Sequence, residues 1–233
     1  MRIPLYIDVS GKKVVVIGGG GVGTSRAKKF LEYGADVVVV SLDFSEELRK
    51  LKEEGKIELI SGDGRDLKIL EEVVKDAFMV VVAVGDRKVN EVVEKLAEKY
   101  GFLKNFANDA EKTEVVVPFE GEVEGIRFAV TTEGKSGIVA RIVRDRIEEM
   151  IRSDEETINL LKVMDFFKRY MKDEDVPVQI RMKMYFAISS DAEFLRLVEK
   201  GKVEEAKAYA VKFLKDYLAG ERDVDESKVR IQF

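Results

Sequence analysis

A run of glycines directly after a short apolar segment is the feature that most limits how this chain folds. Residues 13–17 read Lys-Val-Val-Val-Ile, a β-branched run that predicts a buried strand, and Gly18-Gly19-Gly20-Gly21-Val22-Gly23 follows at once. A helical pattern comes next, with Ala27, Phe30 and Leu31 on one face. The sequence therefore predicts a strand, a glycine turn and a helix, the order typical of domains that bind dinucleotides.

The glycine spacing in this turn matches the physical needs of a dinucleotide site. Gly18 permits the tight turn, Gly20 lets the backbone approach a pyrophosphate, and Gly23 lets the helix pack closely on the strand. Backbone N–H groups at the helix start, including those of Gly21 and Val22, would hold the diphosphate. A glycine-rich turn without a ligand is the alternative. The order of strand, helix, second strand and acidic residue favours the dinucleotide site.

Asp43 is the candidate for reading the cofactor ribose. It lies 20 residues after Gly23 and follows a second apolar run at residues 37–40. If Asp43 accepts a hydrogen bond from the ribose 2′-hydroxyl, the cofactor is NAD rather than NADP, because a 2′-phosphate would meet a like charge. The alternative is a loop carboxylate that caps a helix beginning near Ser45. No Arg or Lys lies between positions 41 and 48 to favour a phosphate.

Strand and helix patterns continue to alternate as far as about residue 109. The further predicted elements are strands at about 57–60, 79–84 and 102–107, and helices at about 66–75 and 89–100. Such repeats predict an α/β fold, a Rossmann-like doubly wound parallel sheet covered on both faces. Ligands bind beyond the carboxyl ends of such strands, which places five polar or small residues near the cofactor. These are Gly85, Asp86, Asn105, Asn108 and Asp109, and each is also a common turn residue.

The pattern changes after Asp109. Segments 115–119 and 126–131, joined across 121–125, predict a strand pair outside the parallel order, and this exposed apolar pair favours a homodimer. A helix follows, and the rest of the chain is largely helical, without a catalytic constellation. We expect three regions: a cofactor-binding domain at 1–112, a dimerisation and substrate region at 113–151, and a helical C-terminal domain at 152–233.

The segment Gly134-Lys135-Ser136-Gly137 opens that helix, whose apolar stripe lies opposite several arginines. A helix start with Lys135, Ser136 and nearby Arg141 is a candidate for binding the carboxylates of an anionic substrate. An ordinary solvated face is the alternative for the arginines.

The composition excludes several classes of chemistry and partner. The chain has no Cys and no His, so Cys nucleophiles, Ser-His-Asp triads and metal sites built on these residues are impossible, and we expect no metal site. With 40 basic and 45 acidic residues, nucleic acid is not expected as a partner. No apolar run approaches the ~18 residues of a bilayer span. Asp8 interrupts the N-terminal segment too soon for a secretory signal, so we expect a cytoplasmic protein without membrane contact.

Several short segments within roughly residues 1–150 form a linked pattern. They are Pro4-Leu5-Tyr6-Ile7, Val16-Ile17-Gly18-Gly19-Gly20 with Val22, Gly34-Ala35, Asp86, Val89-Asn90, Asn105, Gly134-Lys135-Ser136, Ala140-Arg141 and Arg144. With this set the chain resembles the precorrin-2 dehydrogenase family of siroheme synthesis. The resemblance implies a Rossmann domain joined to a dimerisation region and a small helical domain. It also implies oxidation of a tetrapyrrole, precorrin-2, to sirohydrochlorin with NAD as hydride acceptor, and in some members iron insertion.

One position departs from the family pattern. The resemblance implies an aspartate three residues after Asn105, and this chain has Asn108 there, followed by Asp109. An amide is neither an anionic base nor a strong metal ligand. Three readings stay open: Asp109 serves as the base, water or a substrate carboxylate accepts the proton, or the protein binds without catalysis. Ferrochelatase activity is the less favoured form, and a non-catalytic NAD-sensing or tetrapyrrole-binding module is the alternative from another class.

Overall fold

The computed structural model describes residues 2–224, which divide into two compact units. The first unit contains the described chain up to Pro118 together with Thr131–Gly137, and the second contains Phe119–Val130 and the described chain from Ile138 onward. The expected division into regions 1–112, 113–151 and 152–233 stays a prediction. Within residues 2–224, no helix combines the length and apolarity needed to cross a bilayer.

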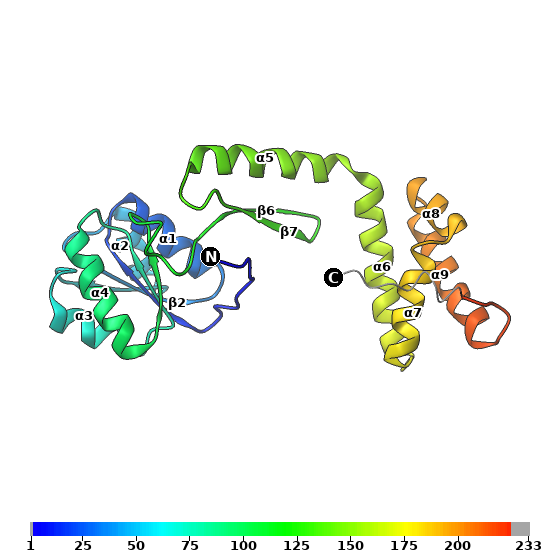
Figure 1. Ribbon diagram of the computed structural model, residues 1–233, viewed down its shortest axis with the longest axis horizontal. Helices are drawn as coiled ribbons and strands as arrows, with labels where there is room; N and C mark the ends of the chain where they lie inside the picture. The colour runs from blue at the N-terminus through cyan, green and yellow to red at the C-terminus, as the bar shows by residue number, and fades with distance from the viewer. Residues whose placement is uncertain (1, 225–233) are drawn as a thin grey trace. The chain divides into compact units, whose positions relative to one another are not determined.

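A five-stranded parallel sheet forms the centre of the first unit (Figure 1), with the strand order β3-β2-β1-β4-β5. The strands are β1 (Lys13–Ile17), β2 (Asp36–Ser41), β3 (Glu58–Ser61), β4 (Met79–Val82) and β5 (Leu103–Phe106). The helices between them are α1 (Gly21–Glu32), α2 (Glu46–Glu53), α3 (Leu67–Val74) and α4 (Arg87–Tyr100). The predicted α/β class is confirmed. From β1 the chain adds β2 and β3 on one side of the sheet and then β4 and β5 on the other. The topological switch point therefore lies between β1 and β4, where such folds bind their ligands.

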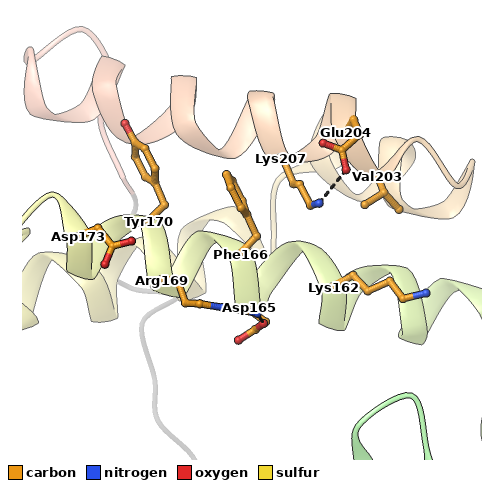
Figure 2. Close-up of a pocket in the computed structure, with 9 residues that line it drawn as sticks. All are labelled: Lys162, Asp165, Phe166, Arg169, Tyr170, Asp173, Val203, Glu204 and Lys207. Carbon is orange, nitrogen blue, oxygen red and sulfur yellow. Dashed lines mark hydrogen bonds and ion pairs between the residues drawn. The ribbon is translucent and has the colours of Figure 1, made fainter.

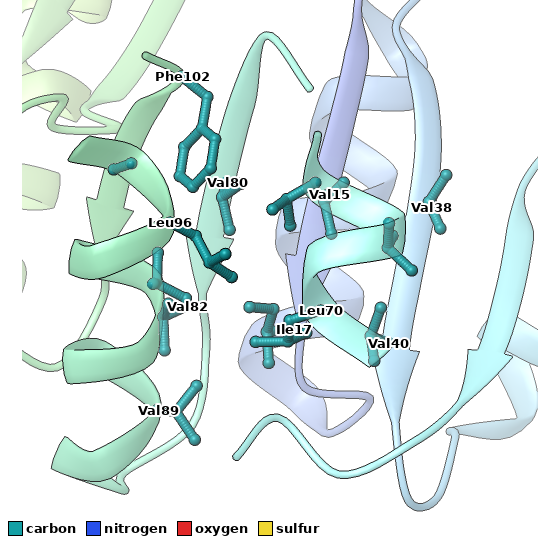
Figure 3. Close-up of a cluster of buried hydrophobic side chains, with 14 of the residues drawn as sticks. Val15, Ile17, Val38, Val40, Leu70, Val80, Val82, Val89, Leu96 and Phe102 are labelled. Atoms are coloured by element: carbon teal, nitrogen blue, oxygen red, sulfur yellow. The ribbon is translucent and has the colours of Figure 1, made fainter. Parts of the chain in front are cut away.

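Both faces of this sheet are buried. Val15 and Ile17 of β1 pack in one cluster with Leu70 of α3 and Leu96 of α4 (Figure 3). Val14 and Val16 face the other way, in a cluster that contains buried residues of α1 and α2. Because successive strand side chains point to opposite faces, two covered faces require apolar residues at every position. This explains why β1 reads as an unbroken apolar run.

The strand pair after the sheet is present, but its first strand lies later in the chain than predicted. The strands are β6 (Phe119–Val123), where the sequence pattern predicts 115–119, and β7 (Ile126–Val130), which begins at the predicted residue. Gly121 lies inside β6 opposite Phe128, where a Cβ would come within 2.4 Å of the ring. The turn consists of Glu124 and Gly125, with φ of 50° and 86°, a conformation that suits a two-residue hairpin. The sequence pattern predicts Gly121 in the connecting loop. In the structure it is a strand residue, and glycine is required there because the Phe128 ring occupies the space of a side chain.

The rest of the second unit is helical. Its helices are α5 (Gly137–Ser153), α6 (Glu155–Asp173), α7 (Val178–Ile188), α8 (Ala192–Glu199) and α9 (Val203–Leu218). A separate apolar cluster, with Phe167 of α6 and Phe194 of α8 fully buried, joins α6 to α9. On α5, by contrast, Ala140 is the one residue buried among those described.

Candidate functional site

The turn between β1 and α1 is packed so tightly that two of its glycines are required by the fold itself. Gly18 has φ of 119°, and a Cβ there would lie 2.8 Å from Val84 Cγ1 and 2.9 Å from the Ala83 carbonyl oxygen. A Cβ on Gly23 would lie 1.8 Å from the Gly18 carbonyl oxygen. The first turn of α1 therefore lies directly against β1 and the end of β4, as the spacing predicts.

The outer side of the same turn is open. A Cβ on Gly20 or Gly21 would meet no atom within 4 Å, and Val22 is 54% exposed. Gly20 is the N-cap of α1 and brings no side-chain acceptor to the helix start. Backbone N–H groups at a helix start attract anions, and the described residues leave open space beside Gly20 and Gly21. The residues present thus fit the diphosphate of a dinucleotide.

Gly19 joins the turn to the loop that follows β2, a role that sequence reasoning missed. A Cβ on Gly19 would lie 2.2 Å from the Asp43 carbonyl oxygen. The Ser45 backbone N–H donates to the Gly19 carbonyl oxygen at 3.1 Å, and Thr24 Oγ1 lies 2.8 Å from Ser45 Oγ. These contacts hold Asp43 beside the glycine turn. The sequence feature that indicates this close contact is the unbroken run of four glycines at 18–21.

Asp43 lies in this loop, at the exposed edge of the site, paired with a cation. Arg49 Nη2 donates to Asp43 Oδ1 at 2.6 Å, and Arg49 Nε donates to the Phe44 carbonyl oxygen at 3.2 Å. The helix cap in this loop is Ser45, whose hydroxyl accepts from the Leu48 N–H, so Asp43 does not cap α2. Arg49 comes directly after residues 41–48, which contain no Arg or Lys, and the first turn of α2 brings its side chain back to the loop.

Arg26 is a second cation that the sequence did not single out. It lies on α1 just after Gly23 and is half-buried, and burial lowers the pKa of its guanidinium below the usual value. Among residues 2–224, no hydrogen bond or ion pair to this guanidinium is found. A partly buried cation without a partner favours an anionic ligand nearby.

Two of the predicted site residues, Asp86 and Asn105, form hydrogen bonds that stabilise the fold. Asp86 is the N-cap of α4 and accepts from the Lys88 N–H at 2.9 Å. Asn105 is buried in β5, where its Nδ2 donates to the Val115 carbonyl oxygen at 2.6 Å. Asn105 therefore holds the segment after β5 against the sheet. Ligand roles for both residues stay predictions.

A polar cavity of about 450 Å³ lies beyond the carboxyl ends of β4 and β5. Its lining residues are Gly85, Arg87, Asn90, Asn108, Asp109, Ala110 and Glu111. Asn108 Oδ1 accepts from Asn90 Nδ2 at 3.0 Å, and Asn108 Nδ2 donates to the Val84 carbonyl oxygen at 2.9 Å. Asp109 Oδ1 accepts from the backbone N–H groups of Glu111 and Lys112, at 3.2 and 3.1 Å. The fold thus brings Gly85, Asn108 and Asp109 together, as predicted, and adds Asn90.

The predicted carboxylate-binding segment lies beside this cavity in the first unit. A Cβ on Gly134 would come within 2.4 Å of Ala110 Cβ, so the turn that contains Lys135 packs on the cavity wall. Arg2 fixes the same region, because its Nη2 donates to the Ala110 carbonyl oxygen at 2.5 Å and its Nη1 pairs with Glu133.

The helix begins later than the sequence indicates. Lys135 and Ser136 precede α5, which starts at Gly137, and they are not part of its first turn. The backbone N–H of Ser136 donates to Thr132 Oγ1 at 2.9 Å. Arg141 is exposed on α5 and belongs to the second unit.

A further cavity, of about 570 Å³, lies in the second unit between α6 and α9 (Figure 2). Phe166 and Tyr170 of α6 point toward α9, with ring centroids 6.2 Å apart, and Lys207 Nζ lies 5.4 Å from the Phe166 ring. Its lining cations are Lys162, Arg169 and Lys207, and its lining carboxylates are Asp165, Asp173 and Glu204. Matched charges of this kind neutralise each other. Among residues 2–224, no cluster of three or more carboxylates is arranged to hold a metal ion.

The parallel sheet, the open glycine turn and the loop that carries Asp43 define an α/β protein with the fold and the turn of a dinucleotide-binding domain. In agreement, a family model described as "Putative NAD(P)-binding" matches residues 5–119. A protein of Methanocaldococcus jannaschii named "Putative precorrin-2 dehydrogenase" is 32% identical over 205 residues, which cover 85% of this chain and 97% of that protein. The chain belongs to the precorrin-2 dehydrogenase family.

Other relatives support the same family. The precorrin-2 dehydrogenase of Methanosarcina barkeri is 27% identical and covers 90% of this chain and 92% of its own length. A siroheme synthase of Actinobacillus pleuropneumoniae serotype 3 is 25% identical over 88% of this chain, which spans only 41% of that relative. The solved structure of SirC, precorrin-2 dehydrogenase, has a TM-score of 0.67 and 22% identity, covering 91% of this chain and 100% of its own, and shows the same fold.

Proposed function

We propose that this protein is an NAD-dependent dehydrogenase that oxidises precorrin-2 to sirohydrochlorin. The observation that carries the proposal is the nearly full-length match to the Methanocaldococcus jannaschii protein named "Putative precorrin-2 dehydrogenase", combined with an open glycine turn at the sheet's switch point. The substrate loses a hydride and a proton in this oxidation. When bound, NAD accepts the hydride.

The residues of the glycine turn hold the cofactor in this proposal. The N–H groups of Gly21, Val22 and Gly23 face the diphosphate, and Gly20 leaves room for it to approach the backbone. Arg26 adds a cation close to these phosphates. The cavity beyond β4 and β5 receives the reacting end of the cofactor and the substrate, since ligands of such sheets lie beyond the carboxyl ends of the strands.

The second half of the site binds a polyanion. Precorrin-2 carries many carboxylates, which pair well with cations and N–H donors. We assign Lys135 and Ser136 to these carboxylates because their turn packs against Ala110 of the cavity wall. We keep Arg141 and Asn105 as further candidates for substrate contact and Asp86 for the cofactor. Two carboxylates line the cavity, those of Asp109 and Glu111, and we assign Asp109 to accept the proton.

The direct test is anaerobic conversion of precorrin-2 to sirohydrochlorin, followed by absorbance with and without NAD. We expect NAD to accelerate the conversion. NAD binding without tetrapyrrole affinity would instead identify a nucleotide-sensing module, and sirohydrochlorin binding without turnover would identify a carrier. Iron added to the product mixture tests chelation separately.

We propose NAD rather than NADP because Asp43 lies at the edge of the site where the adenine ribose binds in such folds. Arg49 complicates this preference, since it pairs with Asp43 and would attract a 2′-phosphate once freed. Asp43→Ala should therefore weaken NAD binding about tenfold and strengthen NADP binding. Titration of the protein with NAD and with NADP measures the ratio of the two Kd values. The double variant with Arg49→Ala should lose the gain for NADP, and an unchanged ratio in Asp43→Ala would contradict the assignment of Asp43.

We also propose that two copies of the chain associate through α5. Ile138, Ile142 and Met150 of this helix are 76%, 44% and 63% exposed, an apolar stripe that water disfavours. A second copy of the same stripe would cover it. Ile142→Glu should convert the dimer to a monomer, measured by light scattering during gel filtration. Val178→Glu, at a 62% exposed apolar residue of α7, is the matched control and should leave the mass unchanged.

A further inference from the structure

Helix α4 carries a buried amide on its apolar face. Asn90 is 3% exposed and lies between Val89 and Val93, which are both buried against the sheet. Burying an amide in such surroundings is unfavourable unless its polar atoms are hydrogen-bonded. The bond from Asn90 Nδ2 to Asn108 Oδ1, at 3.0 Å, supplies one partner, and Asn90 Oδ1 has none among the described residues. Packing alone would place an apolar residue at this position.

The hydrogen bonds of Asn108 give its amide a fixed direction. Its oxygen faces the Asn90 donor, and its nitrogen faces the Val84 carbonyl oxygen. Turning this amide by 180° would oppose two oxygens at Val84 and two nitrogens at Asn90. Val84 in turn lies against the Gly18 turn, where a Cβ on Gly18 would come within 2.8 Å of it. A chain of contacts therefore links α4, the loop after β5 and the cofactor turn.

We propose that Asn90 is a positioning residue that fixes the direction of the Asn108 amide. Held in this way, Asn108 keeps one Nδ2 hydrogen as a neutral donor for an acceptor oxygen of the molecule bound in the 450 Å³ cavity. The identity of that molecule rests on the proposed function: the oxygen belongs to the nicotinamide carboxamide or to a substrate carboxylate. The amide at position 108 suits this role, because an ionised carboxylate cannot donate to the Val84 carbonyl oxygen.

Asn90→Asp tests the direction of the amide with almost no change in shape. An ionised carboxylate at position 90 only accepts, so it repels Asn108 Oδ1 and favours the reversed amide. The protonated acid donates as the native amide does. Burial raises the pKa of the introduced carboxyl above the ordinary ~3.9, so the native arrangement is present at low pH and is lost as pH rises through that raised pKa.

We expect turnover or cofactor affinity of Asn90→Asp to approach the wild-type value at low pH and to fall about tenfold at high pH. The charged residues that line the same cavity, Arg87, Asp109 and Glu111, are present in both proteins, so the ratio of variant to wild type isolates position 90. A change in NAD Kd assigns the bound oxygen to the cofactor, and a change in the KM for precorrin-2 assigns it to the substrate. A pH profile parallel to the wild type would overturn the proposal.

A double-mutant cycle separates this role from simple packing and needs no substrate. If Asn90 acts through Asn108, the double variant Asn90→Ala/Asn108→Ala should lose clearly less free energy of unfolding than the sum of the losses of the two single variants, because their shared hydrogen bond is then counted once. Additive effects would mean that the two side chains act independently, and the proposal would fail. Denaturant unfolding measures the free energies of the four proteins in the cycle. The cycle therefore tests the proposal even if the wild-type protein does not oxidise precorrin-2.

Discussion

Asp109→Asn should lower kcat for precorrin-2 oxidation by about 100-fold or more, because an amide cannot accept the proton that leaves the substrate. The substitution keeps an oxygen where Asp109 Oδ1 accepts from the N–H groups of Glu111 and Lys112. The turn should therefore survive, and NAD affinity should stay near the wild-type value. Asp109→Ala removes both the proton acceptor and the acceptor of the two N–H groups in the turn. It should therefore also lower the free energy of unfolding, by about 1 kcal/mol.

Asp66→Asn is the matched control for this experiment. Asp66 caps α3 through the same geometry, accepting from the N–H groups of Lys68 and Ile69 at 2.9 and 3.3 Å. It lies outside the cavity lining, so its amide variant should turn over precorrin-2 at the wild-type rate. If Asp109→Asn is equally active, Asp109 only stabilises the turn, and water or a substrate carboxylate accepts the proton.

The second large effect is expected from Gly23→Ala. The added methyl group would lie 1.8 Å from the Gly18 carbonyl oxygen, a backbone atom that moves only if α1 shifts away from the sheet. Overpacking of this severity destabilises a protein by about 3 kcal/mol, which corresponds to a fall in Tm of roughly 10 °C. Circular dichroism during heating measures the shift, and NAD binding should be lost because the displaced helix carries the diphosphate site.

Gly20→Ala separates the packing of the turn from the approach of the cofactor. Its methyl group would meet no protein atom within 4 Å, and its φ of −79° suits alanine, so Tm should change by less than about 3 °C. The same methyl group lies where the diphosphate approaches the backbone, so NAD affinity should fall. Equal losses of stability in the two variants would contradict this division of roles.

The strands of the parallel sheet and the glycine turn could be predicted because their causes are local. A strand covered on both faces needs an unbroken apolar run, and β1 begins and ends where the sequence indicates. The bounds of the first hairpin strand, β6, could not be predicted in this way. Whether Gly121 belongs to a turn or to a strand depends on Phe128 across the pair, a contact that spacing alone does not reveal.

In the candidate site, too, features with local causes could be predicted, and contacts between distant residues could not. Asp43 could be found by its distance from the glycine turn, but its partner Arg49 becomes visible only when α2 is folded back on the loop. Asn90 appeared in the sequence as part of a family pattern without a role. Its role depends on Asn108, 18 residues away, and on the packing of α4 against the end of β5.

The sequence by itself determined the fold class, the cofactor turn and the family, because each is written in the order and spacing of neighbouring residues. The tertiary structure decided which polar groups share a cavity and which of their atoms already have partners. Hydrogen bonds such as those of Asn108 join segments that are far apart in the chain, and their direction depends on distances of about 3 Å that form only when helices and strands have packed.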